Sequence, residues 1–185
     1  DGTRPLFRAW TPVTENFRIF PKLDDILDNT STIGEVLPTT DRTLNFRLLV
    51  RDGQGGVSFD ETELTVVDTG EAFAVTAPLT NDIWSTNTPT ITWQVAGTNS
   101  VPISCSSVDI LLSTDGGNTF TQTIADGVDN NGQSQVSLSG SSCNHEIETS
   151  AARVKVACDD NIFFAINEGN FTINQQFSAS DIAIS

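Results

Sequence analysis

Alternation of apolar and polar residues, broken at short intervals by turns, most constrains how this chain can fold. TLNFRLLVRD (43–52) alternates along its length, GQGG (53–56) supplies flexible turn residues, and VSFDETELTVV (57–67) runs back. A period of two residues is that of a β-strand, because successive side chains of a strand point to opposite faces. The segment is therefore predicted to be a β-hairpin.

The turn also sets the register predicted for this hairpin. If the residues flanking the turn pair first, Arg47 lies opposite Glu61, and the two form a surface ion pair worth a few tenths of a kcal/mol. The same register puts Leu49 against Phe59 on the face that is otherwise polar. Two apolar residues there predict a covered surface, formed by further strands of the same unit or by a partner chain.

The residues before the hairpin are less regular. PLFRAW and FRIF are typical of short strands, and KLDDILD (22–28) of one or two helical turns. Asp24, Asp25 and Asp28 are expected to form a solvated face, with a calcium site as the alternative. Residues 1–70 are predicted to be a partial β-sandwich unit that ends in the hairpin, because one convincing hairpin cannot by itself close a sandwich.

A second series of strands follows DTGEAF (68–73), which is predicted to be a linker. Six to eight short strands in about 100 residues are typical of an immunoglobulin- or fibronectin-type sandwich, here residues 71–175, with 176–185 as a tail or linker. The fold class is thus predicted to be all-β, with two antiparallel β-sandwich units in tandem. The alternation predicts these core residues: Ile91, Trp93, Val95, Val108, Ile110, Leu112, Val154, Val156 and Cys158.

Composition narrows the classes of partner. The formal net charge is −15, and Lys22 and Lys155 are the only lysines. Such a surface repels phosphate backbones and anionic lipids, so nucleic-acid binding is not expected. No apolar stretch approaches the roughly 20 residues of a membrane helix, so membrane insertion is not expected either. The acidity fits a secreted protein, one that works in salt or with calcium, and equally a surface that only favours solubility.

STDGGNTF (113–120) resembles the Asp-box, S-x-D-x-G-x-T-(W/F), of sialidase-like propellers. The matching residues are Ser113, Asp115, Gly117, Thr119 and Phe120. A propeller repeats the box in each blade, whereas this chain has it once. We therefore expect a structural turn and not a glycosidase, with Asp115 accepting backbone N–H bonds, Gly117 adopting a positive φ and Phe120 filling the core.

Three cysteines allow one disulfide and one free thiol in an oxidising compartment. SVDILLS (107–113) and ARVKVAC (152–158) are predicted to be neighbouring antiparallel strands, which brings Cys105 and Cys158 to the same end of the sandwich. A disulfide between them is the prediction. A bridge from Cys143 to either one is the alternative, and three reduced cysteines are expected of an unsecreted chain.

Other candidate sites are weighed against simpler structural roles. Asp126, Asp129 and Asn131 could bind calcium, although their spacing does not match DxDxDG and favours a polar turn. CNHE (143–146) could contribute to a metal site or a Cys–His pair, but nothing supplies further ligands, and a polar loop is the simpler interpretation. Trp84 is the candidate platform for a carbohydrate ring, with a role as a plug for the sandwich end as the alternative.

The longer blocks resemble a known family. PLFRAWTP, FRIFPKLDDIL and EVLPTTDRTLNFRLLVRD resemble the segment after the catalytic domain of secreted bacterial reprolysin-like zinc metallopeptidases. ITWQVAGT, VDILLSTDGGNTF and NIFFAINEGNFTI resemble the β-sandwich that comes next in those proteins. The resemblance spans roughly residues 4 to 173, and in the family opening strands of the first unit precede the position of Asp1.

The family's zinc site departs from this sequence. Its motif HExxHxxGxxH needs three histidines, whereas the chain has one, His145. No catalytic residue is carried over, and the chain is predicted not to be an enzyme. The resemblance implies secreted, non-catalytic accessory domains that space, stabilise or dock the enzyme. Their partners would be its catalytic domain or a chain that completes the first unit. The alternative is an adhesin module that binds polysaccharide or extracellular matrix protein.

Overall fold

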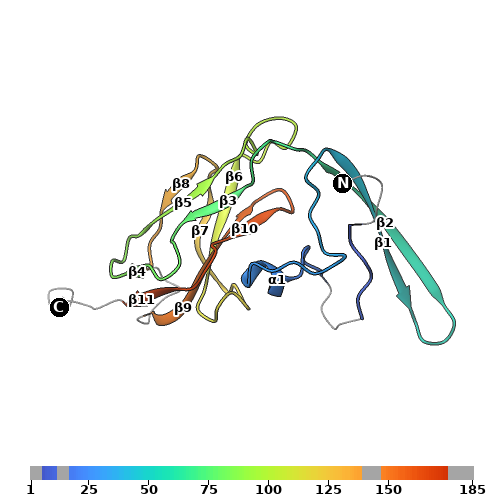
Figure 1. The fold of residues 1–185 in the computed structure, drawn as a ribbon, viewed down its shortest axis with the longest axis horizontal. Helices are drawn as coiled ribbons and strands as arrows, with labels where there is room; N and C mark the ends of the chain where they lie inside the picture. The colour runs from blue at the N-terminus through green and yellow to red at the C-terminus, as the bar shows by residue number, and fades with distance from the viewer. Residues whose placement is uncertain (1–5, 12–16, 139–146, 175–185) are drawn as a thin grey trace, which may run out of the picture.

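Nearly all regular structure in the computed structural model, which describes residues 6–11, 17–138 and 147–174, is β-strand (Figure 1). After residue 70 the strands form two sheets. The larger follows the order β4 (Ile83–Trp84), β11 (Phe171–Asn174), β9 (Glu148–Cys158), β6 (Ser107–Ser113) and β7 (Gln122–Asp129), with β10 (Phe164–Ile166) also paired to β9. The smaller follows the order β3 (Ala74–Ala77), β5 (Thr90–Gln94) and β8 (Gln133–Gln135). Every pairing except β4–β11 is antiparallel, so the predicted all-β class is confirmed.

The core lies between these two sheets, because one face of each central strand is buried. In β6 the alternating residues Val108, Ile110 and Leu112 are fully buried, and in β9 Val154 and Val156 are. They pack in one cluster with residues of the smaller sheet, among them Ile91 and Trp93. The period-2 prediction of the core therefore holds for these strands, while Val95 is only partly buried at its edge.

Trp84 belongs to this core, which corrects its prediction as a carbohydrate platform. Its side chain is 8% exposed, and its ring packs on Phe171 with the ring centroids 4.5 Å apart. The two-residue strand β4 pairs with β11 and turns the indole inward. The alternative, a plug at the end of the sandwich, is the role that the structure gives it.

The hairpin in the N-terminal part has the predicted register. β1 (Arg42–Arg51) pairs with β2 (Val57–Val66), with Arg47 opposite Glu61 and Leu49 opposite Phe59. The Arg47 guanidinium forms an ion pair with Glu61, as predicted. Among the described residues, no third strand pairs with this two-stranded sheet.

A short helix, α1 (Leu23–Leu27), confirms the predicted helical turns of KLDDILD. The strand predicted for FRIF was wrong, since residues 17–20 form no ladder, and PLFRAW contributes only a single bridge between Phe7 and Glu35. Instead of pairing as strands, these segments contribute side chains that support the hairpin.

Three aromatic rings fix the base of the hairpin. Phe7, Phe20 and Phe46 lie with ring centroids 4.7 to 6.0 Å apart, so Phe46 of β1 packs on both segments that precede the helix. Beside them Glu35, 1% exposed, accepts hydrogen bonds from the Trp10 indole and the Arg18 guanidinium. A buried carboxylate needs such donors, and here they tie three segments together.

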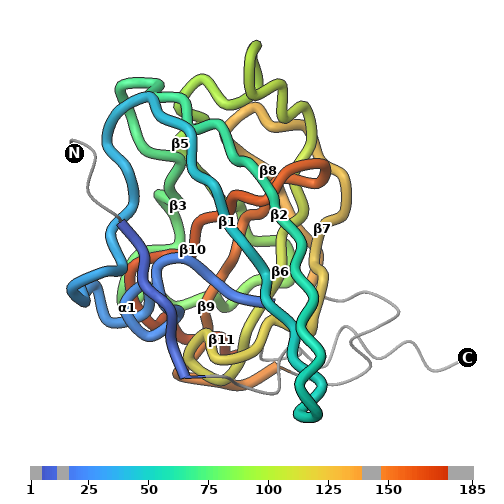
Figure 2. The backbone as a smooth tube through the Cα atoms, turned by 90° about the vertical axis from the view of Figure 1, so that its right-hand side faces the viewer, coloured from blue at the N-terminus to red at the C-terminus, as the bar shows by residue number. Residues whose placement is uncertain are grey.

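The hairpin stands off from the sandwich. Figure 1 shows α1 between the two, with β1 and β2 running away from it, and Figure 2 shows the hairpin passing in front of the larger sheet. The helix thus lies between the hairpin and the sandwich, while residues 67–73 link β2 to β3 along the chain.

Candidate interaction site

The Asp-box residues form a hydrogen-bonded turn between β6 and β7. The Ser113 hydroxyl donates to Asp115 Oδ1 at 2.6 Å and accepts from the Gly117 N–H at 2.9 Å. Asp115 also accepts from the Thr119 backbone N–H at 2.9 Å and from the Thr119 hydroxyl at 2.7 Å. These bonds close the loop on itself, with both carboxylate oxygens of Asp115 acting as acceptors.

The same bonds stabilise the charged form of Asp115. The Ser113 hydroxyl, followed by the backbone and hydroxyl of Thr119, lowers the pKa of Asp115 from 3.8 to about 2. The carboxylate is therefore ionised at any pH at which the protein is expected to work. It acts as a fixed acceptor of hydrogen bonds within the turn.

Phe120, the last residue of the box, does not fill the core as expected. It is half-buried outside the core cluster, and Lys155 Nζ lies 5.0 Å from its ring centroid and 5.4 Å from that of Phe164. Burial between the rings lowers the pKa of Lys155. Its neighbours in β9, Val154 and Val156, point inward, so the alternation places Lys155 on the outer face of the sheet.

Helix α1 docks on the Asp-box through Gly117. A Cβ on Gly117 would lie 2.5 Å from Leu27 Cδ2 and 3.4 Å from Arg153 Cγ. The glycine, at φ +94°, thus provides both a turn conformation and the space into which Leu27 of the helix fits. The Asp-box is therefore part of the contact between the N-terminal part and the sandwich.

Arg153 bridges the same contact with hydrogen bonds. It is 7% exposed, and its guanidinium donates to Asn170 Oδ1 at 2.7 Å, to the Asn167 carbonyl at 2.7 Å and to the Leu27 carbonyl at 3.1 Å. Leu27 is the last residue of α1, where backbone carbonyls lack helical partners, so a cation there is favourable. Burial lowers the pKa of Arg153, while the carboxylate of Asp28 opposes that shift.

Asn167 completes this network at the gap between β10 and β11. Its carboxamide oxygen accepts from the Val154 N–H at 2.8 Å, and its amide donates to the Gly169 carbonyl at 2.6 Å. The side chain thus replaces the missing strand partner of β9. Neither Arg153 nor Asn167 was singled out from the sequence. The available signal was charge, since Arg153 and Lys155 are the only lysine or arginine residues after Arg51.

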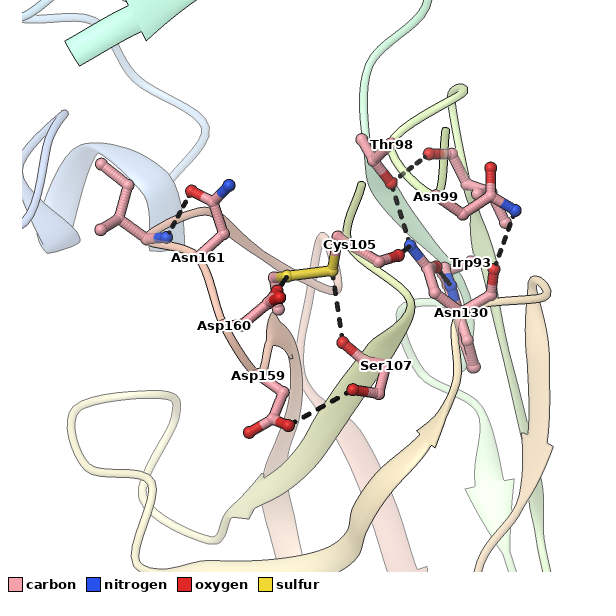
Figure 3. The surroundings of a disulfide bond; sticks show 12 residues. Trp93, Thr98, Asn99, Cys105, Ser107, Asn130, Asp159, Asp160 and Asn161 are labelled. Carbon is pink, nitrogen blue, oxygen red and sulfur yellow. Dashed lines mark hydrogen bonds between the residues drawn. A yellow bond between two sulfur atoms is a disulfide. The ribbon is translucent and has the colours of Figure 1, made fainter. Parts of the chain in front are cut away.

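The predicted disulfide joins Cys105 and Cys158, whose Cα atoms lie 6.1 Å apart (Figure 3). Val108 pairs with Cys158, so β6 and β9 are the neighbours that the prediction required. Next to it Asn130 accepts from the Trp93 indole at 2.8 Å and donates to the Thr98 hydroxyl and the Cys105 carbonyl, each at 3.0 Å. All polar groups of this buried amide have hydrogen-bond partners. The residues at this end of the sandwich therefore have a structural role.

Among the described residues, one group of side chains brings three His, Cys, Asp or Glu ligand atoms close enough together to hold a metal ion. It consists of Cys105, Cys158 and Asp160, and its sulfurs are joined in the disulfide. Asp25, expected on a solvated face, is instead buried at 8% exposure, because it accepts hydrogen bonds from Thr30 and from Thr32 in the turn after α1. CNHE and Cys143 lie outside the described residues.

The calcium candidates after β7 have local structural surroundings. Asp126 lies in the irregular part of β7 and Asp129 at its end, paired with Ser107. Asn131 accepts from the Gln133 N–H at 3.1 Å in the turn to β8. The polar turn is therefore present, and calcium binding by these three residues stays a prediction.

The outer half of the hairpin exposes large apolar side chains on both faces. Five residues, hereafter the hairpin tip, have relative exposures of 46 to 66%: Leu48, Leu49, Val50, Val57 and Phe59. Leu49 and Phe59 are thus exposed opposite each other, so the described residues do not form the covered surface predicted for them. The Arg47 guanidinium lies 4.7 Å from the Phe59 ring centroid. Contiguous apolar surface of this kind is typical of interaction sites, so the hairpin tip is the candidate site.

No protein-family model and no curated protein matches this chain. No helix in the described part is long and apolar enough to cross a membrane.

Proposed function

We propose that the chain is a non-catalytic accessory region of a secreted zinc metallopeptidase, in which the hairpin tip docks on a neighbouring domain. The exposure of five large apolar side chains on both faces of one hairpin carries this proposal. A two-stranded sheet is marginally stable alone, and exposed apolar residues on both faces add nothing to its folding. Docking on a neighbouring domain accounts for these exposed side chains.

The sandwich serves as the support in this proposal. Its two sheets are antiparallel apart from the β4–β11 pairing, which supports an immunoglobulin- or fibronectin-type module, and α1 contacts it through Arg153 and Gly117. The disulfide is compatible with an extracellular protein. The catalytic domain of a reprolysin-like peptidase is the proposed partner, on the resemblance of the sequence blocks described above.

The alternative of a polysaccharide-binding adhesin has less support. Such modules present flat aromatic rings to solvent, whereas Trp84 and Trp93 are buried. Trp10 is half-buried, with Lys22 Nζ 3.3 Å and the Arg8 guanidinium 4.3 Å from its ring centroid. Each of the described tryptophan rings is thus already in contact with other groups of the chain.

The test uses the purified chain, immobilised, with three analytes: a reprolysin-like catalytic domain, insoluble polysaccharide and collagen. We expect the catalytic domain to be retained, and the double variant Leu49→Ser and Phe59→Ser to lose that retention. The matched control replaces two exposed apolar residues elsewhere, Val101→Ser and Ile162→Ser, which are 87% and 70% exposed. Retention of polysaccharide or collagen alone, unchanged by the hairpin variant, would favour the adhesin instead.

A further inference from the structure

Strand β1 forms an open edge on the hairpin. Among the described residues, β1 and β2 pair only with each other, so each has one side with free backbone groups. Open edges are templates for another strand, and proteins commonly protect them. An edge that is left open beside an exposed apolar surface is therefore a candidate for strand addition.

The turn determines which β1 residues face the open edge. The Asp52 N–H donates to the Gly56 carbonyl at 3.3 Å, so these two residues form a hydrogen-bonded pair. Hydrogen-bonded and non-hydrogen-bonded pairs alternate along an antiparallel ladder. The backbone groups of Arg51, Leu49 and Arg47 are therefore directed outward, away from β2.

Charge separates the two edges. β1 carries Arg42, Arg47 and Arg51 and no acid, so it holds three of the chain's nine cations in a protein of net charge −15, with Arg47 already paired to Glu61 of β2. β2 carries three acids and no base: Asp60, Glu61 and Glu63. Like charges on directly opposed strands are destabilising and opposite charges stabilising. An acidic strand is therefore favoured beside β1 and disfavoured beside β2.

We propose that the β1 edge binds an extended segment of a partner protein as an added antiparallel strand with alternating acidic and apolar residues. This rests on the proposed docking function and names the chemistry of the docked segment. On one face the strand would place acids opposite Arg51 and Arg47 and an aromatic residue opposite Leu49. On the other it would place apolar residues opposite Val50, Leu48 and Phe46.

A second copy of this chain fits the edge less well. Pairing of two β1 strands with Leu49 opposite Leu49 would place Arg47 opposite Arg51. β2 of another copy offers acids, but its residues opposite Phe46, Leu48 and Val50 in the present register are polar: Thr62, Asp60 and Ser58. The net charge of −15 further opposes self-association. The complementary pattern therefore indicates a different polypeptide.

The proposal is tested with a labelled peptide whose central sequence, read antiparallel to Arg51 through Phe46, is Glu-Val-Phe-Val-Glu-Val. The control peptide has lysine at both glutamate positions. We expect the acidic peptide to bind the intact chain about tenfold more tightly, since two cross-strand pairs change sign between the peptides. The preference should shrink at high salt. On binding, amide hydrogen exchange should slow at Arg47, Leu49 and Arg51.

Two further arms keep the test independent of folding. N-methylation of alternate peptide residues, which removes the bonding N–H groups without changing the protein, should abolish binding. The variant Arg47→Glu with Arg51→Glu should prefer the lysine peptide. The matched variant Glu63→Lys, on the other edge, should retain the original preference.

Equal affinity for the two peptides, or protection at Phe59 and Glu61 in place of the β1 amides, would overturn the proposal. So would self-association of the chain through the hairpin with no peptide bound. Retention of the catalytic domain by the hairpin tip without peptide binding would remove strand addition and leave the docking function standing. Loss of both would remove both.

Discussion

Gly117 adopts a backbone conformation with positive φ and also lies in a contact between segments that are far apart in the sequence. We expect Gly117→Ala to destabilise the chain by about 2–3 kcal/mol, because strain at positive φ is added to a clash with Leu27. The matched control is Gly127→Ala, also at positive φ (58°) but with no neighbouring atom within 4 Å of the added Cβ. Its cost should be about 1 kcal/mol. Urea unfolding measures both, and equal losses would show that the helix contact adds nothing.

Asp115 is the residue whose stabilising contribution should depend most clearly on pH. Its pKa is about 2 when folded, against 3.8 ordinarily, so the contribution is complete above pH 4 and is lost as the pH falls toward 2. The stability difference between the native chain and Asp115→Asn should therefore shrink across that interval. In Ser113→Ala the pKa of Asp115 should rise, because the Ser113 hydroxyl is the largest cause of its lowering. NMR of the Asp115 carboxyl carbon would follow this pKa. An unchanged pKa would contradict the assignment.

The hairpin element divides into an anchored base and a free outer half. Phe46 packs on Phe7 and Phe20, whereas Leu48, two residues along the same face, is 66% exposed. We expect Phe46→Ala to cost about 3 kcal/mol and Leu48→Ala less than about 0.5 kcal/mol. Limited proteolysis within residues 17–66, together with urea unfolding, would measure the difference. A large loss from Leu48→Ala would mean that the tip is packed within the chain.

The alternation of apolar and polar residues predicted the register of paired strands better than it predicted how deeply their side chains are buried. The register of Arg47 with Glu61 follows from a short turn and a strict period of two, both of which are local. Whether a face is buried depends on what lies above it, and the sequence of a strand does not contain that information. Leu48 and Val108 occupy equivalent positions in alternating strands, yet one is exposed and the other fully buried. The prediction that Trp84 is a carbohydrate platform was wrong for the same reason.

At the scale of the whole molecule, Arg153 couples the N-terminal part to the sandwich. We expect Arg153→Ala to cost about 3 kcal/mol, because the buried Asn167 carbonyl and the partly buried Leu27 carbonyl lose their donor. Unfolding should separate into two transitions, with the N-terminal part first. Lys155→Ala, two residues along β9, removes a cation held only between aromatic rings and should preserve a single transition. Calorimetry distinguishes the two, and a single transition in both variants would refute the coupling.

The disulfide contributes to the stability of the sandwich as a whole. It joins residues 53 positions apart, and closing a loop of that length is worth about 4 kcal/mol through the unfolded state. Replacing both cysteines by serine should lower the free energy of unfolding by about that amount. A reduced native chain should behave like the variant. If reduction leaves the urea midpoint unchanged, the bridge does not stabilise the fold.

The contact between the parts was beyond prediction from the sequence. Leu27 and Arg153 are 126 residues apart, and such a contact leaves no periodic trace in either segment. Arg153 stands in ARVKVAC, where alternation identified the buried valines and the cysteine but not the role of the arginine that precedes them. The disulfide could be predicted from the sequence, because the two strands predicted to be neighbours bring Cys105 and Cys158 to the same end of the sandwich.

Because its base is anchored and its outer half is free, a small rotation at the base of the hairpin moves its outer end a long way. Phe46 is the last β1 residue held by the aromatic cluster, and the five residues from there to Arg51 span about 17 Å. A rotation of about 10° at the base displaces the end of β1 by about 3 Å, over half the spacing of roughly 4.8 Å between paired strands. A change at Phe20, which does not lie in the hairpin, would therefore shift Leu49 and Phe59 relative to the sandwich without altering a single atom of either side chain.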